Sequence, residues 1–218
     1  PLVAIKAFAQ LLPERYTDPE FQNEFKDLVT REIERLGGII EQIDGFAHPP
    51  PLRFGPVDIR SCVQNGVEAV LPPQGDARVA LKTRIADDLP PVWGDARSLT
   101  EALAHLVRNA VEALAGRQGA EITLGVELID RGDGHPEVEI SVQDNGPGIA
   151  PELRDKVFSP FCTTKPRGLG LGLPTVKRTV ADHHGRLELR STEKGTRVTV
   201  ILPCNLSPAK HETHPDRG

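Results

Sequence analysis

Asp144-Asn145-Gly146-Pro147-Gly148-Ile149 is the stretch that decides the fold, because it follows an apolar run and precedes Gly168-Leu169-Gly170-Leu171-Gly172-Leu173. Two further segments stand around these glycine-rich ones in a fixed order, His105 with Asn109 upstream and Phe158 to Lys165 between them. Each glycine segment alone is a common loop. All four segments in this order predict a nucleotide-binding site.

The second glycine segment has the chemistry of a phosphate cradle. Three of its glycines precede a helix that Pro174 opens: Gly168, Gly170 and Gly172. Bare backbone N–H groups at a helix start bind phosphate oxygens. The spacing excludes a P-loop, which needs Gly-Lys-Ser/Thr, and a Rossmann turn. Lys165 and Arg167, just upstream, are candidates for the positive charge that faces a triphosphate.

The order of these segments resembles the ATP-binding domain of sensor histidine kinases and, more broadly, the ATPases that include gyrase, mismatch-repair ATPases and the large heat-shock chaperone. The segments correspond to the N box, G1 box, F box and G2 box of that family. The resemblance covers roughly residues 54 to 204, and a helical resemblance covers roughly residues 1 to 48. It implies a histidine protein kinase that binds ATP and Mg²⁺ and passes phosphate to a histidine, for relay to a response regulator.

The resemblance gives Asn109 and His105 the catalytic positions on one helix face. Asn109 is the implied Mg²⁺ ligand, and its carboxamide oxygen is a hard donor of the kind Mg²⁺ accepts. Many sensor kinases have Asn where this chain has His105, so this residue is either a base near neutral pH or a polar wall of the pocket. Glu112 replaces a phosphate-binding Lys of some kinases, so phosphate contacts are expected elsewhere.

Asp144 closes a predicted strand, and the resemblance makes its carboxylate the acceptor for the adenine amino group. Gly146 and Gly148 let the backbone turn sharply beside the ring. Thr196 is expected to assist Asp144. The remaining expected ATP contacts are Thr164, Lys165, Gly168, Gly170, Gly172 and Leu173.

Two further pairs of residues receive structural roles only. Phe158 and Phe161 are expected to pack the loop that closes over ATP. His183 and His184 end a helix, where positive charge suits the helix dipole, and no catalysis is assigned to them.

The first 48 residues predict a helical hairpin. Leu2, Ile5, Ala9 and Leu12 have helical spacing up to Pro13, which is expected to stop or kink the helix. A second apolar stripe runs from Val29 to Ala47, on a helix capped by Thr17 with Glu20 or by Asp18. Such wide apolar faces predict a homodimeric four-helix bundle, although the hairpin docking on its own ATP domain is the alternative.

The predicted fold class is α+β, a two-helix dimerisation hairpin followed by an α/β sandwich. The predicted organisation is a hairpin over 1–48, a proline-rich linker over 49–53, an ATP-binding domain over 54–205 and a disordered tail over 206–218. Within the ATP domain we predict helices over 59–71, 96–116 and 174–184, and strands over 56–59, 79–85, 122–129, 138–142, 186–191 and 196–202. Asp95 is expected to cap the helix over 96–116.

Composition narrows the partners. A net charge of -5 across 218 residues gives no basic footprint for nucleic acid. Three cysteines lack zinc or disulfide spacing, which suits a reducing cytosol. The sequence has no apolar stretch long enough to predict a membrane-spanning helix, so no membrane contact is expected for this chain. We therefore expect a cytoplasmic chain, with any membrane anchor upstream in the full-length protein.

The start of the chain bears on the expected chemistry. Leu2-Val3-Ala4-Ile5 resembles the sequence just after the phosphoacceptor motif of the kinase family, His-Glu-x-x-Asn-Pro. The sequence as given is therefore expected to bind ATP without autophosphorylating by the usual route. Two rival functions stay open: an ATP-gated conformational switch, as in chaperone or repair ATPases, and a non-catalytic dimerisation module.

Overall fold

The computed structural model describes residues 2–71, 79–130, 134–165 and 168–204. The chain divides into two compact units, Pro1–Pro51 and Leu52–Gly218. Arg167 and the predicted tail lie outside the described residues. Among the helices described, none is both long enough and apolar enough to cross a bilayer.

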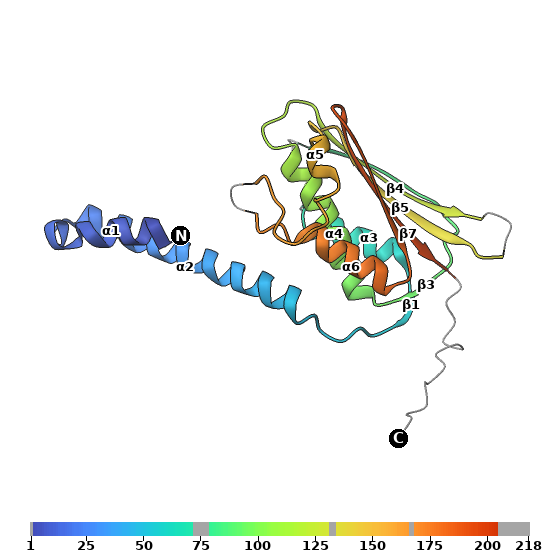
Figure 1. Cartoon of the computed structure of the whole chain (residues 1–218), viewed down its shortest axis with the longest axis horizontal. Coiled ribbons are helices and arrows are strands. Elements are labelled where there is room, and N and C mark those ends of the chain that lie inside the picture. Colours follow the sequence, from blue (N-terminus) through green and yellow to red (C-terminus); the bar gives the residue numbers. More distant parts are fainter. Residues whose placement is uncertain (1, 72–78, 131–133, 166–167, 205–218) are drawn as a thin grey trace, which may run out of the picture. The chain divides into compact units, whose positions relative to one another are not determined.

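The first unit is a pair of helices, α1 (Leu2–Arg15) and α2 (Pro19–Ala47) (Figure 1). The side chain of Asp18, rather than the Thr17 box, caps α2 by accepting the N–H groups of Glu20 and Phe21. The Arg15 guanidinium bonds this carboxylate at 2.6 Å and, with these N–H groups, holds the pKa of Asp18 below its usual value.

Proline does not end α1 where the sequence suggested. Pro13 lies inside the helix, which continues to Arg15. Proline has no N–H, so the carbonyl group four residues before it loses its helical hydrogen bond. The loss of one bond close to the end of a helix is tolerated, and the helix continues for two residues past Pro13. Of the two outcomes expected at Pro13, the stop is wrong by two residues, and the kink stays a prediction.

Aromatic packing joins the two helices of this unit. The rings of Phe8 and Phe21 stack with centroids 5.7 Å apart, and Phe25 stacks on both. Large apolar side chains stay exposed in the single chain: Leu2, Val3, Leu11, Ile33, Ile40 and Ile43. The four-helix bundle of two copies remains a prediction that would cover them.

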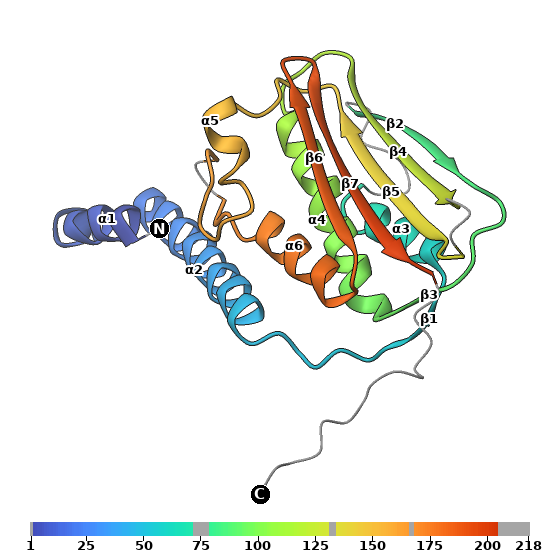
Figure 2. The same cartoon turned by 45° about the vertical axis from the view of Figure 1, so that its right-hand side comes forward.

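The second unit is a five-stranded sheet in the order β2-β4-β5-β7-β6. Its strands are β2 (Val79–Ile85), β4 (Ala120–Ile129), β5 (Glu137–Asp144), β6 (Arg186–Thr192) and β7 (Gly195–Pro203). β2 pairs with β4 in parallel, and the other pairs are antiparallel. α3 (Ile59–Glu68), α4 (Ala96–Ala113) and α6 (Gly172–Asp182) cover one face (Figure 2). This layering confirms the predicted α+β class.

Alternation in the central strands builds the core. In β5, Val138, Ile140 and Val142 are buried, and Asp144 follows them in the same two-residue rhythm. Each large apolar side chain buried this way contributes about 1.5–3 kcal/mol. Asp144 therefore lies on the face of the sheet that the helices cover.

Several element ends differ from the predicted ones. α3 stops at Glu68 and α4 at Ala113, where Gly116 has a φ of 76°. The last helix, α6, begins two residues before Pro174. Two short elements escaped the sequence patterns: β3 (Val92–Gly94) and α5 (Pro151–Arg154). The strand β1 (Gly55–Val57), which pairs with β3, was predicted.

Candidate functional site

Asp95 fixes the start of α4, the helix that carries Asn109. Its Oδ1 accepts the N–H of Ser98 at 2.7 Å, and its Oδ2 accepts the N–H of Arg53 at 2.7 Å. Burial alone would raise the pKa of this carboxyl, but the donors from Ser98 and Arg53 hold it below the ordinary value. The predicted cap is confirmed, with an additional tie to the chain before β1.

His183 has a different role from the one predicted from the sequence. This side chain is fully buried, and its Nδ1 donates to the carbonyl oxygen of Thr179 at 2.7 Å. Its Nε2 accepts the N–H of Asp95 at 2.9 Å, which requires a lone pair on that nitrogen. The ring thus links the end of α6 to the start of α4, and the expected cation is wrong for His183, whereas for His184 it stays a prediction.

Asp144 is held in place by backbone donors from two segments. Its Oδ1 accepts the N–H of Gly146 at 2.8 Å and that of Thr196 at 3.2 Å. Burial raises the pKa of this carboxyl above its usual value, although both donors oppose the shift. A buried carboxylate with a fixed orientation is suited to accept a hydrogen bond from a ligand.

Gly148 and the β6–β7 turn are in intimate contact. Gly148 has a φ of 75°, and a Cβ there would lie 1.9 Å from the carbonyl oxygen of Thr192. Beside it, Ser191 Oγ accepts the N–H of Ile149 at 2.7 Å and meets Thr196 Oγ1 at 3.0 Å. Ser191 was not predicted, because no motif marks it and its partners come from another segment.

The start of α6 packs on the polar face of α4. A Cβ built on Gly172 would lie 3.4 Å from His105 Nδ1 and 3.7 Å from Asn109 Nδ2. Gly170 has a φ of 67°, and its carbonyl oxygen accepts the N–H of Phe161 at 3.2 Å. The N box and the G2 box, more than fifty residues apart in sequence, therefore meet.

Lys165 connects the F box to the same face. Its Nζ lies 3.0 Å from Asn109 Oδ1 and forms an ion pair with the carboxylate of Glu112. Its own N–H donates to Thr163 Oγ1 at 3.1 Å, which shapes the turn before it. One ammonium thus stands beside the amide that the sequence assigns to a metal ion.

Other predicted residues are less closely placed. Thr164 and Gly168 are exposed, and Leu173 packs partly buried against the core. Phe158 is partly buried as expected, but Phe161 is 65% exposed with a φ of 64°. The packing role predicted for Phe161 is therefore wrong in this structure, because its backbone turns the ring outward.

His105 lies next to Asn109 on the same face of α4. Its Nε2 is 4.0 Å from Glu101 Oε1. Burial and the charge of Arg108 lower the pKa of His105 below its usual value, so the neutral ring is favoured near neutral pH. Both readings from the sequence, a base and a polar wall, are compatible with a neutral imidazole.

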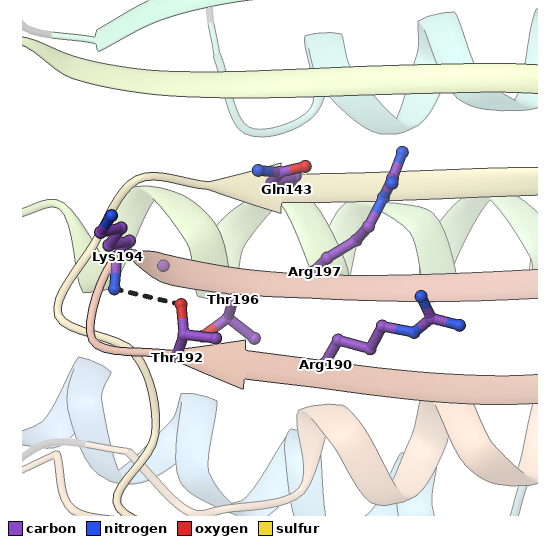
Figure 3. Close-up of a pocket in the computed structure, with 7 residues that line it drawn as sticks. Gln143, Arg190, Thr192, Lys194, Thr196 and Arg197 are labelled. Carbon is purple, nitrogen blue, oxygen red and sulfur yellow. Dashed lines mark hydrogen bonds between the residues drawn. The ribbon is translucent and has the colours of Figure 1, made fainter.

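A shallow hollow of about 210 Å³ lies where β5 and β6 end and β7 begins (Figure 3). Its lining residues are Gln143, Arg190, Thr192, Lys194, Gly195, Thr196 and Arg197. Arg190 and Arg197 are register partners on neighbouring strands. Only Thr196 belongs both to this lining and to the predicted nucleotide site, so we treat the two as different places.

The oxygen donors near Asn109 decide whether this site can hold Mg²⁺. Among the residues described, no three His, Cys, Asp or Glu side chains gather as a metal cluster. Mg²⁺ in nucleotide sites takes one or two protein oxygens and completes its shell with phosphates and water. Asn109 offers one such oxygen, Oδ1, which faces the ammonium of Lys165 at 3.0 Å, so this donor set is compatible with Mg²⁺.

Comparisons with known proteins identify the family to which the chain is similar. Residues 94–206 match the model of the histidine kinase-, DNA gyrase B- and HSP90-like ATPase family. The chain is 31% identical over 208 residues to the sensor histidine kinase ZraS of Escherichia coli (strain K12), covering 95% of this chain and 43% of that protein. It is 34% identical over 212 residues to the sensory histidine kinase/phosphatase NtrB of Azospirillum brasilense, covering 93% and 52%.

A solved structure gives a similar result. The crystal structure of full-length ShkA in complex with AMPPNP matches with a TM-score of 0.68 and 27% identity, over 83% of this chain and 39% of that one. The chain thus spans about half or less of the length of these relatives.

Proposed function

Since the chain belongs to the histidine kinase-, DNA gyrase B- and HSP90-like ATPase family, we propose that it serves as the ATP-binding catalytic portion of a sensor histidine kinase. The whole protein would transfer the γ-phosphate of ATP to a histidine. The observation that carries this proposal is the meeting of Asn109, Lys165 and Gly172 on one face of α4, which brings three boxes together.

The adenine end of the site is assigned to Asp144 and its neighbours. The carboxylate would accept the adenine amino group, while the N–H groups of Gly146 and Thr196 hold it in orientation. Gly148 keeps the backbone close to the β6–β7 turn. A carbonyl-bearing base such as guanine presents an acceptor at that point, so Asp144 would reject it.

The phosphate end is assigned to the start of α6 and to Lys165. Gly168, Gly170 and Gly172 would offer backbone N–H groups, with Thr164 and Leu173 beside them, and Lys165 would add a charge-assisted bond. Asn109 would hold Mg²⁺, which neutralises charge that develops on the phosphates when bound. His105, neutral and adjacent, would contact the hydration shell of that site.

The remaining partners follow from the kinase resemblance. Two copies would pair through the exposed apolar residues of α1 and α2, and the phosphoryl group would pass to a response regulator. The helical hairpin favours this reading over an ATP-gated switch, because a dimerising hairpin next to the ATP domain is how the kinase presents its phosphoacceptor. ShkA, named above, binds the ATP analogue AMPPNP.

Phosphoryl transfer tests the kinase proposal. The chain is extended upstream so that Pro1 becomes the last residue of a phosphoacceptor motif, His-Glu-x-x-Asn-Pro, and a second version carries Gln for the motif histidine. We expect label from γ-³²P-ATP on the first version only, stable to base and labile to acid. ATP turnover without protein labelling would favour the ATPase switch. The absence of both turnover and labelling would favour the dimerisation module.

A further inference from the structure

Two oxygens of α4 converge on one cation. Asn109 Oδ1 lies 3.0 Å from the ammonium of Lys165, and the carboxylate of Glu112 pairs with the same nitrogen. Residues three apart on a helix are neighbours on its surface. The helix therefore presents a carboxamide and a carboxylate to a single point, and a positive charge occupies that point.

The contact between Lys165 and this oxygen pair is one that exchanges readily. The side chain of Lys165 is 38% exposed and that of Glu112 is 45% exposed. Ion pairs in contact with water are weak because solvent screens both charges, so the ammonium can exchange these oxygens for those of a triphosphate. A lysine held this weakly, on the segment before the glycines, is free to change partners.

We propose that Glu112 is a second protein ligand of the divalent cation, beside Asn109, and that Lys165 moves from this oxygen pair to the phosphates when nucleotide and metal bind. The inference rests on the proposed function, because it requires a nucleotide at the site. It assigns a role to the residue at which this chain departs from kinases with a lysine at that position.

The charges give this assignment a distinctive signature. Without a divalent cation, the carboxylate of Glu112 repels a triphosphate and also retains Lys165. With the cation present, the same carboxylate adds a negative ligand to a hard ion. Glu112 therefore weakens binding of metal-free nucleotide and strengthens binding of metal. A residue that merely supported the fold of α4 would affect both in the same direction.

The test is Glu112→Gln, which preserves size and one oxygen while removing the charge. Mg²⁺ is titrated by calorimetry into protein saturated with AMPPNP, and AMPPNP is titrated separately in EDTA. We expect Mg²⁺ to bind about 10-fold or more weakly, in line with losses at metal sites. We expect metal-free AMPPNP to bind several-fold more tightly, and melting curves to match those of the wild type.

Glu101→Gln is the matched control. It removes the same charge from the same helix, eight residues or about 12 Å along the axis from Asn109. It should leave both affinities within about twofold, because exposed charges at that distance are screened. Lys165→Gln should weaken metal-free AMPPNP, because the carboxylate of Glu112 then faces the phosphates without an ammonium beside it. It should not weaken Mg²⁺, since the oxygen pair loses its competitor.

Two results would overturn the assignment while leaving the proposed function intact. In the first, the wild type binds MgAMPPNP, and Glu112→Gln binds Mg²⁺ as tightly as the wild type does. The other is a parallel loss of Mg²⁺ and of metal-free nucleotide. A wild-type chain that binds no AMPPNP with or without Mg²⁺ would instead refute the proposed function, and this inference with it.

Discussion

Nε2 of His183 accepts the backbone N–H of Asp95 at 2.9 Å, although the two residues are 88 positions apart in sequence. Asp95 caps α4, and His183 follows the last turn of α6. The ring of Phe54 stacks on His183 with centroids 5.0 Å apart. This contact ties together the two helices that present Asn109 and the phosphate glycines.

Removing the His183 ring should destabilise the second unit. In His183→Ala, a buried cavity and two lost hydrogen bonds should lower the free energy of unfolding by about 2–4 kcal/mol, measured by urea denaturation. The matched control is His184→Asn, an exposed neighbour whose φ of 55° suits Asn. Equal stability of the two variants would contradict the linking role of His183.

Contact with the β6–β7 turn should make Gly148 far less replaceable than another glycine of similar backbone conformation. Gly148→Ala places a Cβ 1.9 Å from Thr192 O, whereas Gly116, with a φ of 76°, has nothing within 4 Å of that position. We expect a loss of about 1–2 kcal/mol for Gly116→Ala and about 3 kcal/mol or more for Gly148→Ala. Thermal and urea unfolding measure both, and equal losses would argue against the close contact.

Asp144→Asn should separate stability from binding. Asn retains an Oδ1 acceptor for Gly146 and Thr196, but its amide group would face the adenine amino group with a second donor. ATP affinity should fall about 10- to 100-fold, as for a lost bond to a charged group of about 1.5–3 kcal/mol. Calorimetry measures the affinity, and an unchanged ATP affinity would remove Asp144 from the adenine contact.

The raised pKa of Asp144 also predicts in which direction Asp144→Asn changes the free energy of unfolding. Burial raises the pKa of Asp144 in the folded state above the unfolded value, so the ionised carboxylate is less favourable in the folded protein. This penalty is present above the folded-state pKa and disappears as the pH falls through it toward the unfolded value. Asp144→Asn should therefore be at least as stable as the wild type at pH 7, measured by urea unfolding without nucleotide.

Acid should weaken ATP binding by the wild type at a higher pH than an ordinary aspartate would allow. The carboxylate must be ionised to accept the adenine amino group well, and its pKa is raised by burial. Affinity measured by calorimetry should fall as the pH is lowered toward that raised pKa. Asp144→Asn, which has nothing to titrate there, should show a flatter profile, and parallel profiles would place the titrating group elsewhere.

The sequence predicted what local chemistry decides. Asp95 as a helix cap, Asp144 at a strand end and the glycines before α6 follow from propensity, alternation and motif spacing. Short elements escaped: β3 has three residues and α5 has four, too few for a period to show. Pro13 was expected to stop or kink the helix, because the pattern cannot show how many residues a helix continues past proline.

Non-local contacts were beyond the sequence. Ser191 and His183 acquire their roles from partners 42 and 88 residues away. Lys165 meets Glu112 across 53 residues, and no local pattern pairs them. Phe161 was expected to pack the loop because phenylalanine is usually buried, but its side chain is exposed and its φ is positive. Tertiary geometry, rather than composition, decided each of these positions.

The central claim is that Asp144, Asn109 and the glycines before α6 together bind ATP with Mg²⁺. Calorimetric titration of the purified chain with MgATP, and separately with MgGTP, tests it most directly. We predict saturable binding of MgATP at one site per chain, with MgGTP at least about 10-fold weaker for want of the adenine amino donor. No heat with millimolar MgATP, or equal affinity for the two nucleotides, would contradict the account.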